Sequence, residues 1–189
     1  LVTVDMTRLF YATYYFLSFL ALPFLLLYIL LRLATNPASF AYFLCRLALI
    51  LPPTPPRRQP RVWLHAASIG EVLSCIPLIS RLKTAGHEVC LSTGTRAGHT
   101  AALRHLPAAE VIFLPFDFNW CIRRVLRRIT PDLVLISEVE IWPSLVRCVK
   151  AAGLPLFLIG GRMPEADLRS FARWGFFFKR VLSQYDGLF

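Results

Sequence analysis

The chain has 189 residues, enough for one domain of ordinary size with its own core and an additional segment. Hydrophobic residues make up 56% of it and charged residues 17%, an apolar excess over the roughly 45–50% of average soluble domains that indicates contact with lipid. The net charge of +10 then favours anionic lipid as a partner, and nucleic acid is not expected because no nucleic-acid-binding motif occurs in the sequence.

The cysteines and histidines do not form a pattern typical of metal or disulfide chemistry. The five cysteines are odd in number and scattered, and none stands in C-x-x-C spacing, so neither a disulfide framework nor a zinc site is expected. Reduced thiols in a cytoplasmic compartment are the simplest interpretation. No histidine has metal-ligand spacing, and none is assigned a chemical role: His65, His87, His99 and His105.

A transmembrane anchor is predicted over residues 1–35. The 23 residues from Leu9 to Leu31 carry no charge, and at ~1.5 Å per residue they suffice to cross a ~30 Å hydrocarbon core. Arginines are more frequent after this run than before it, so the positive-inside rule places the following domain on the cytoplasmic side of the membrane. A cleaved signal peptide is the competing interpretation, although its apolar region spans only about 7–15 residues.

Residues 36–60 are expected to connect the anchor to a domain. The apolar run Phe40–Leu51 is too short to span a membrane and contains Arg46, so it forms either a helix lying in the interface or a helix packed on the domain. The basic, proline-rich segment Pro52–Pro60 then predicts a stiff linker and a domain boundary. The chain begins with Leu and ends in "YDGLF", typical of the start of a buried strand, so we expect a fragment of a longer protein.

Residues 61–189 predict an α/β domain with a Rossmann-like parallel sheet. Short apolar runs at "VWLHA", "EVCLS", "VIFLP", "LVLIS" and "LFLIG" alternate with longer stretches of helical spacing, which is typical of βαβ units. Gly86 is expected to end the first helix, and Pro143 and Gly153 to flank a later one. The segment "CIRRVLRRI" predicts an amphipathic helix with its arginines facing outward. Ligands of such sheets bind beyond the carboxyl ends of the strands.

The first loop at that edge, "ASIGE", allows two roles for its glutamate. Ser68 and Glu71 have the spacing of a capping box, in which the serine caps a helix and the glutamate reaches back to the backbone. Gly70 would let a ligand approach the backbone, and a carboxylate here is placed to accept a proton. Cap and catalytic base therefore both remain open on residue types alone.

Two further loops carry candidate binding residues. "STGTRAG" offers Thr95 and Arg96 before a helix, which suits either an anion or a plain polar turn. "SEVEIWPSL" places Glu138 and Glu140 on the same face if the strand continues through them. Carboxylates so close together either meet a cation or take part in proton chemistry, unless one caps the next helix and the other pairs with an arginine.

Together these motifs resemble those of a known family. "WLHAASIGEVLSCIPLI" is followed by "LSTGTRAG", by "LPFDFNWCIRRVLRRITPDLVLISEVEIWPSL" and by "LPLFLIGGRM". This succession resembles the amino-terminal half of 3-deoxy-D-manno-octulosonic acid (Kdo) transferases, the membrane-anchored enzymes of lipid A maturation. The pair "HAASIGE" and E-x-E-x-W-P is the specific part, and the resemblance covers nearly the whole chain.

The resemblance implies a GT-B architecture of two Rossmann-like domains and an inverting transfer. The amino-terminal domain would receive the lipid A precursor, and a carboxyl-terminal domain would hold cytidine monophosphate-activated Kdo. No cofactor or metal is implied. Residues 61–189 would be the acceptor domain alone, so this polypeptide by itself is expected to be inactive.

The resemblance also assigns roles to single residues. Glu71 matches the family's proposed base, which takes the proton of the glucosamine hydroxyl, and Glu138 matches a glutamate that supports the acceptor or the cleft. The usual Asn-Ala-Arg-Leu-Ser run is replaced here by residues 160–164, of which only Arg162 can be carried over. The candidates for substrate binding are Ser68, Gly70, Thr95, Arg96, Glu138, Glu140 and Arg162.

Two alternatives remain beside a Kdo transferase. One is another lipid-linked GT-B transferase, which would not be expected to carry this pair of motifs. The other is a non-catalytic, membrane-anchored lipid-binding module. An activity assay of the complete protein with labelled donor and lipid A precursor distinguishes both alternatives from a Kdo transferase.

Overall fold

The computed structural model describes residues 6–53, 56–161 and 175–189. The chain divides into two units, Leu1–Leu44 and Cys45–Phe189, each of which is compact in itself. The second unit contains the whole sheet.

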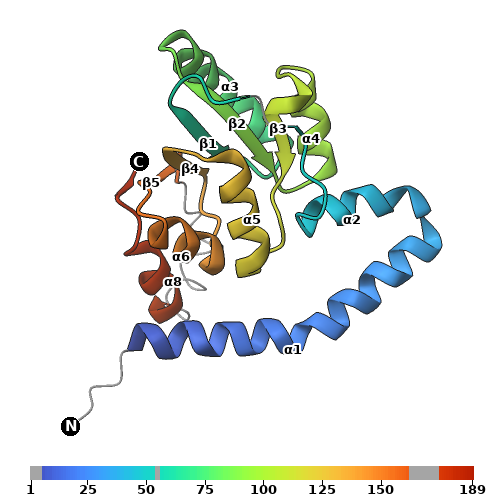
Figure 1. The fold of residues 1–189 in the computed structure, drawn as a ribbon. Coiled ribbons are helices and arrows are strands. Elements are labelled where there is room, and N and C mark those ends of the chain that lie inside the picture. The colour runs from blue at the N-terminus through green and yellow to red at the C-terminus, as the bar shows by residue number, and fades with distance from the viewer. Residues whose placement is uncertain (1–5, 54–55, 162–174) are drawn as a thin grey trace. The chain divides into compact units, whose positions relative to one another are not determined.

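The first unit is mainly one long helix, α1 (Met6–Thr35), followed by the short helix η1 (Pro37–Ser39) and most of α2 (Phe40–Arg46). The uncharged run predicted as an anchor lies entirely within α1, and most of its large apolar side chains are exposed. The helix bends along its length (Figure 1), and Pro23 within it lacks the N–H that would bond to the preceding turn. By length and composition α1 could cross a membrane, which indicates membrane association.

The second unit is built on a parallel sheet with the strand order β3-β2-β1-β4-β5-β6. The predicted strands are confirmed as β1 (Arg61–His65), β2 (Glu88–Thr93), β3 (Val111–Phe113), β4 (Leu133–Ser137) and β5 (Leu156–Ile159). "YDGLF" contributes β6 (Gly187–Leu188), but this edge strand is not buried: Leu188 is 55% exposed.

The helices cover both faces of the sheet (Figure 1). Helices α3 and α4 pack together on one face, and α5 and α6 pack together on the other, as right-handed crossovers in opposite directions require. The helices and the 3-10 turn of this unit are α3 (Ile69–Thr84), α4 (Arg96–Leu103), η2 (Ala108–Glu110), α5 (Asn119–Ile129), α6 (Pro143–Ala151) and α8 (Gly175–Leu182). Gly86 and Gly153 follow α3 and α6 with φ of 84° and 71°, so the predicted helix ends are confirmed.

The strand β1 shows how the core is divided between the two faces. Val62 and Leu64 belong to the apolar cluster beneath α3 and α4. Because side chains alternate along a strand, Trp63 and His65 point to the opposite face, where both are fully buried. A histidine at such a position needs hydrogen-bond partners inside the protein.

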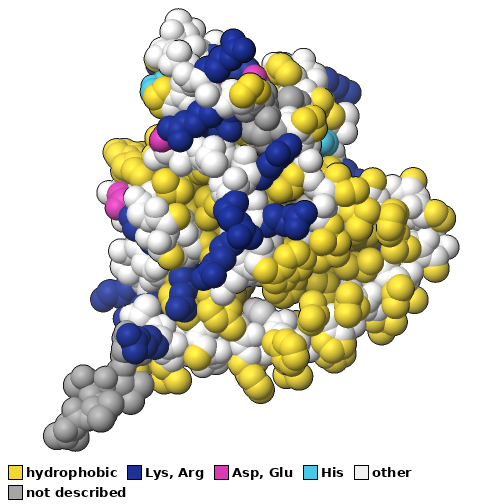
Figure 2. Space-filling view, in the orientation of Figure 1, with side chains coloured by type: hydrophobic (Ala, Val, Ile, Leu, Met, Phe, Trp, Pro, Cys, Tyr) yellow, Lys and Arg dark blue, Asp and Glu magenta, His cyan; other side chains and the backbone are white. Residues whose placement is uncertain are grey.

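Helix α5 is amphipathic, as predicted. Ile122, Val125 and Ile129 are buried, and the arginines on its other side are exposed. Figure 2 shows Lys and Arg side chains gathered in a band on the face where α5 lies.

The end of the predicted segment 40–51 packs on the sheet-bearing unit. Arg46 is 8% exposed, donates from Nη1 to the carbonyl oxygen of Gly94 over 2.9 Å and lies 4.9 Å from the centre of the Phe116 ring. Of the two alternatives for this segment, the interactions of Arg46 support packing on the domain. Arg46 belongs to the second unit, and its guanidinium is directed at Gly94 and Phe116 of that unit.

Candidate active site

The candidate site lies where the order of the strands reverses. The chain leaves β1 toward β2 on one side and leaves β4 toward β5 on the other, while β1 and β4 are neighbours. Ligands of open α/β sheets bind beyond the carboxyl ends of the strands at such a switch point. The two glutamate-bearing loops follow these two strands.

The loop after β1 forms the predicted capping box at the start of α3. The hydroxyl of Ser68 accepts the amide of Glu71 over 3.3 Å, and Oε1 of Glu71 accepts the amide of Ser68 over 3.2 Å. The other carboxylate oxygen, Oε2, accepts the amide of Ala67 over 2.8 Å. Glu71 is 8% exposed, so both of its oxygens are held by backbone amides in a largely buried position. A carboxylate has about four acceptor positions, which leaves room for a further partner.

The loop after β2 is attached to the same backbone. The carbonyl oxygen of Ala67 accepts the amides of Gly94 and Thr95 and the hydroxyl of Thr95, at 3.2, 3.1 and 3.0 Å. The Thr95 hydroxyl also caps α4 by accepting the amide of Gly98 over 3.0 Å. A Cβ on Gly98 would lie 2.8 Å from the Ala67 oxygen, so this close approach requires glycine. Thr95 therefore has a structural role as a helix cap, whereas the residue types alone had suited either an anion site or a plain polar turn.

A cavity of about 470 Å³ opens beside the first turns of α3. Its described lining includes Gly70 and Ser74 from α3 and Ser137 and Glu138 from the end of β4. A Cβ on Gly70 would meet only the Ser68 hydroxyl, 4.0 Å away, so the space beside this glycine is open. Carboxylate, hydroxyls and open backbone of this kind suit a ligand that carries hydroxyl groups.

The two glutamates after β4 do not share a face. The strand ends at Ser137, and Glu138 has a φ of 59°, in the left-handed region. The turn directs Glu138 to the cavity, whereas Glu140 lies beside His65 on the other side of the sheet edge. The prediction of a common face is therefore wrong, because it required the strand to continue.

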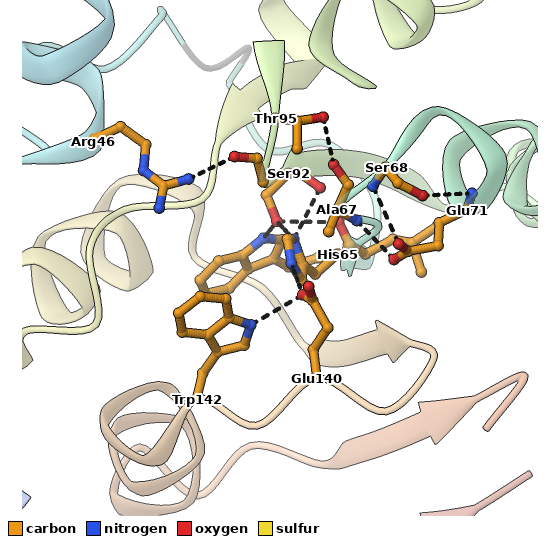
Figure 3. A network of polar contacts seen from close by, with 12 residues as sticks. Arg46, His65, Ala67, Ser68, Glu71, Ser92, Thr95, Glu140 and Trp142 are labelled. Atoms are coloured by element: carbon orange, nitrogen blue, oxygen red, sulfur yellow. Dashed lines mark hydrogen bonds and ion pairs between the residues drawn. The ribbon is translucent and has the colours of Figure 1, made fainter. Parts of the chain in front are cut away.

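Glu140 ends a buried hydrogen-bond network (Figure 3). Its Oε2 lies 2.6 Å from Nε2 of His65 and accepts the indole N–H of Trp142 over 3.0 Å. Nδ1 of His65 lies 2.9 Å from the hydroxyl of Ser92, which accepts the indole N–H of Trp63 over 2.9 Å. Burial opposes ionisation of Glu140, but the interactions with His65 and Trp142 outweigh it and hold the pKa of Glu140 below its ordinary value of 4.5.

Comparison with known proteins identifies the family. Residues 44–189 match the family described as 3-deoxy-D-manno-octulosonic-acid transferase (kdotransferase). The chain belongs to this family. It is 33% identical over 131 residues to 3-deoxy-D-manno-octulosonic acid transferase of Bordetella pertussis, covering 66% of this chain and 31% of that protein. The corresponding transferase of Chlamydia trachomatis serovar D is 35% identical over 130 residues, covering 67% and 29%.

This Kdo transferase family chain thus spans about three tenths of the length of the curated relatives it matches. Its fold is similar to that of solved sugar-nucleotide enzymes. A protein described as a UDP-N-acetylglucosamine 2-epimerase of Listeria monocytogenes superposes with a TM-score of 0.53 at 12% identity, over 70% of this chain and 38% of that one. A second UDP-N-acetylglucosamine 2-epimerase gives 0.52 at 10% identity, over 70% and 42%. The predicted Rossmann-like domain of the GT-B class is confirmed.

The structure brings together only part of the site predicted for this Kdo transferase domain. Gly70 and Glu138 line the cavity, and Ser68 and Glu71 form the adjacent helix start. Arg96 is exposed at the start of α4 and is not among the described residues that line the cavity. Arg162 lies outside the described residues.

One residue of the site network was missed. His65 was given no role because it has no metal-ligand spacing, but its ring joins Glu140 to the interior of the sheet. The available signal was its position: a polar residue at the carboxyl end of a strand, on the face opposite Leu64, beside the loops that bind ligands.

Proposed function

We propose that this chain forms the acceptor domain of a membrane-anchored glycosyltransferase that moves Kdo from its cytidine monophosphate-activated form to a lipid A precursor. One observation carries the proposal: within the segment that matches the Kdo transferase family, a cavity at the sheet's switch point is lined by Gly70, the residue before the glutamate of the capping box, and by Glu138. The transfer inverts the anomeric centre, because the acceptor hydroxyl displaces the nucleotide in a single step.

In this proposal Glu71 is the general base. Its carboxylate lies at the amino end of α3, where the backbone amides of Ala67 and Ser68 donate to its two oxygens and hold it in place. The carboxylate takes the proton of the acceptor hydroxyl through an acceptor position that the amides leave open, while that oxygen forms the new bond to the sugar. Its held geometry means that little reorganisation is needed when the acceptor arrives.

The cavity receives the sugar end of the acceptor. Glu138 and the serine hydroxyls offer hydrogen-bond partners for glucosamine hydroxyls, and Gly70 leaves room for the ring to approach the start of α3. Of the remaining candidates, Ser68 caps α3, whereas Thr95, Arg96 and Glu140 lie in loops at the same edge of the sheet and Arg162 lies outside the described residues. Thr95 acts by capping α4, and Arg96 contributes positive charge toward the acceptor's phosphates.

The donor is assigned to a second Rossmann-like domain of the complete protein, facing this one across a cleft. The relatives are about three times as long as the stretch that this chain matches, which leaves room for such a domain. The acceptor, membrane lipids and the activated sugar are the partners, and neither metal nor nucleic acid has a part in the proposed reaction.

A transfer assay with the complete protein tests this function. Labelled cytidine monophosphate-activated Kdo and a bis-phosphorylated lipid A precursor should give a labelled lipid product. Binding of the precursor without any transfer would favour a non-catalytic lipid-binding module. Transfer of a different nucleotide-activated sugar, with Kdo left unused, would favour another lipid-linked transferase.

The membrane assignment has its own test. We propose that α1 spans the inner membrane with the sheet-bearing unit in the cytoplasm. Deletion of residues 1–44 removes α1 but keeps Arg46, whose interactions belong to the second unit, so the remaining protein should be extracted without detergent. A truncated protein that sediments with membranes as firmly as the original, or a carboxyl-terminal tag reached only from the periplasm, would contradict the assignment.

A further inference from the structure

The side chain of His65 joins two loops at the sheet edge without bordering the cavity. Its Nε2 lies 2.6 Å from Oε2 of Glu140, and its Nδ1 lies 2.9 Å from the hydroxyl of Ser92. The ring is fully buried, and the described residues that line the cavity do not include it. Any effect of His65 on a ligand in the cavity must therefore pass through its neighbours.

The neighbours of His65 select one tautomer of its ring. The indole N–H of Trp63 donates to the hydroxyl of Ser92, so that hydroxyl must donate its own proton elsewhere. Nδ1 of His65, at 2.9 Å, is a nearer acceptor than the carbonyl oxygen of Leu64, at 3.5 Å. An Nδ1–H donating to the Ser92 carbonyl, 3.0 Å away, would leave the hydroxyl only that distant acceptor. In the neutral ring the proton thus resides on Nε2, and in the imidazolium form Nε2 is protonated as well, so in both forms Nε2–H is donated to the carboxylate of Glu140.

The loop that carries Glu140 is fixed at both ends without His65. At one end the amide of Glu138 donates to the carbonyl oxygen of Ile159 over 2.9 Å. At the other end the carboxylate of Asp117 accepts two amides of the first turn of α6, each over 2.9 Å. Loss of the hydrogen bond from His65 would release the side chain of Glu140 between these two attachments, and the backbone amides at both ends would stay attached to the domain.

The first residue of the loop holds a backbone conformation that needs support. Glu138 has a φ of 59°, which costs free energy in a residue with a side chain and persists where the surroundings fix it. The amide of Glu140 donates to the carbonyl oxygen of Glu138 over 3.0 Å, so the two glutamates belong to one tight turn. The side chain of Glu140, held by His65 and Trp142, is thus connected through this turn to Glu138 at the cavity.

We propose that His65 is a positioning residue for transfer: its Nε2–H, directed by Ser92 and Trp63, holds Glu140 and thereby keeps Glu138 at the cavity. The inference rests on the proposed function for its kinetic consequence, but its structural consequence is independent of that function. His65 touches neither the acceptor nor the reacting atoms.

Two substitutions at His65 in the complete protein separate this role from simple packing. The amide nitrogen of His65→Gln falls near the former Nε2 and can donate to Glu140, whereas that of His65→Asn reaches only the former Nδ1. We expect His65→Gln to retain kcat within about threefold and His65→Asn to lose about 10²-fold, the usual effect of misplacing a site group by about 1 Å. His105→Asn, at an exposed histidine far along the chain from this network, is the matched control and should leave kcat unchanged.

A double variant tests whether His65 acts through Glu138. If it does, adding His65→Asn to Glu138→Gln should cause little loss beyond that of Glu138→Gln alone. Equal losses in His65→Gln and His65→Asn, or losses that multiply in the double variant, would overturn the proposal.

The structural role of His65 can also be tested by NMR spectroscopy, without an activity assay. If the complete protein transferred no Kdo, the proposed function would be contradicted, but this measurement would still test the positioning role. The ¹⁵N shifts of His65 should report a proton on Nε2. The indole N–H signal of Trp142, which donates to Glu140, should move in His65→Asn and stay in place in His65→Gln. A ring that carries its proton on Nδ1 alone, or a Trp142 signal unmoved by His65→Asn in a folded protein, would refute the positioning role.

Discussion

The two glutamate-bearing loops at the switch point are built in different ways. The carboxylate of Glu71 is held by amides only three and four residues earlier in the chain, within the first turn of a helix. Glu140 is held by His65, 75 residues earlier in the chain, and the loop around it has no regular structure. One site group is therefore positioned by local backbone geometry and the other by the packing of the whole sheet.

The two loops should therefore respond differently to substitutions. A change at Glu71 disturbs one helix start and the chemistry assigned to it. A change in the network of Glu140 reaches β1, β2 and the loop before α6 together. Substitutions that remove one partner at a time can therefore distinguish the two loops, in the order of their expected effects.

The largest effect is expected from Glu71→Gln in the complete protein. Glutamine is no proton acceptor at neutral pH, so turnover should fall by about 10²–10⁴-fold, the usual contribution of a general base. The substitution should also cost about 1–3 kcal/mol of stability. Both carboxylate oxygens of Glu71 accept a backbone N–H, so the side-chain NH2 group of glutamine would face one of these donors and leave it without an acceptor. Turnover should be measured well below the melting temperature.

Ser68→Ala is the matched control for this glutamate. It removes the other half of the capping box and should cost about 0.5–2 kcal/mol of stability while leaving the carboxylate in place. Turnover of the folded Ser68→Ala protein should remain high. A folded Glu71→Gln protein that retains more than about a tenth of wild-type turnover would leave Glu71 as a cap and remove its role as base.

In the second loop, Glu140→Gln should destabilise the fold by about 1.5–3 kcal/mol at neutral pH, the range for hydrogen bonds to charged groups. The pKa of Glu140 in the folded protein lies below its ordinary value of 4.5, so the contribution of its carboxylate to the free energy of unfolding is fully present above pH 4.5. The contribution is lost as the pH falls through the folded pKa, since the unfolded state takes up the proton first. Denaturant unfolding of both proteins should show their difference shrinking below about pH 4.5. A difference that grew on acidification would contradict the ionised form of this hydrogen bond.

Gly98→Ala tests the close approach of the first two loops. The added methyl group would lie 2.8 Å from the backbone oxygen of Ala67, so the loops must separate, at a cost of about 1–3 kcal/mol. Gly153→Ala provides a contrasting control, because a Cβ there meets nothing within 4 Å and only its φ of 71° is unfavourable. Thermal unfolding that ranks Gly98→Ala as harmless would show that the loops can part freely.

The smallest effect is expected at Thr95. Thr95→Val removes the hydroxyl that caps α4 and donates to the Ala67 carbonyl, which should cost about 0.5–2 kcal/mol. Thr95→Ser keeps both hydrogen bonds and should be nearly neutral. Unfolding experiments on this pair compare the variant without the hydroxyl with the one that keeps it, and a Thr95→Val protein as stable as Thr95→Ser would show that the cap contributes little.

The sequence predicted those parts of the fold and site that depend on near neighbours. The capping box at Ser68, the helix ends at Gly86 and Gly153 and the apolar strands follow from spacing and propensity over a few residues, and the structure confirms them. The turn at Glu138 could not be predicted in the same way, because a non-glycine residue with positive φ is held by interactions with residues far away in the sequence.

The network of His65 could be predicted only in part from the sequence. Alternation along β1 predicts that its side chain faces away from Leu64, but only the pairing of β1 with both β2 and β4 brings Ser92 and the loop of Glu140 to it. Arg46 shows the same limit, since an arginine in an apolar run is equally compatible with a lipid surface and with a buried hydrogen bond to Gly94.

The carbonyl oxygen of Ala67 has a consequence for hydrogen exchange. It accepts two amides of the loop after β2, while the amide of the same residue donates to Glu71. These hydrogen bonds share one peptide segment, so they cannot open one at a time without leaving the others strained. The amides of Ala67, Gly94 and Thr95 should therefore exchange with solvent deuterium with a common free energy of opening, as one cooperative unit whose opening also frees the proposed base.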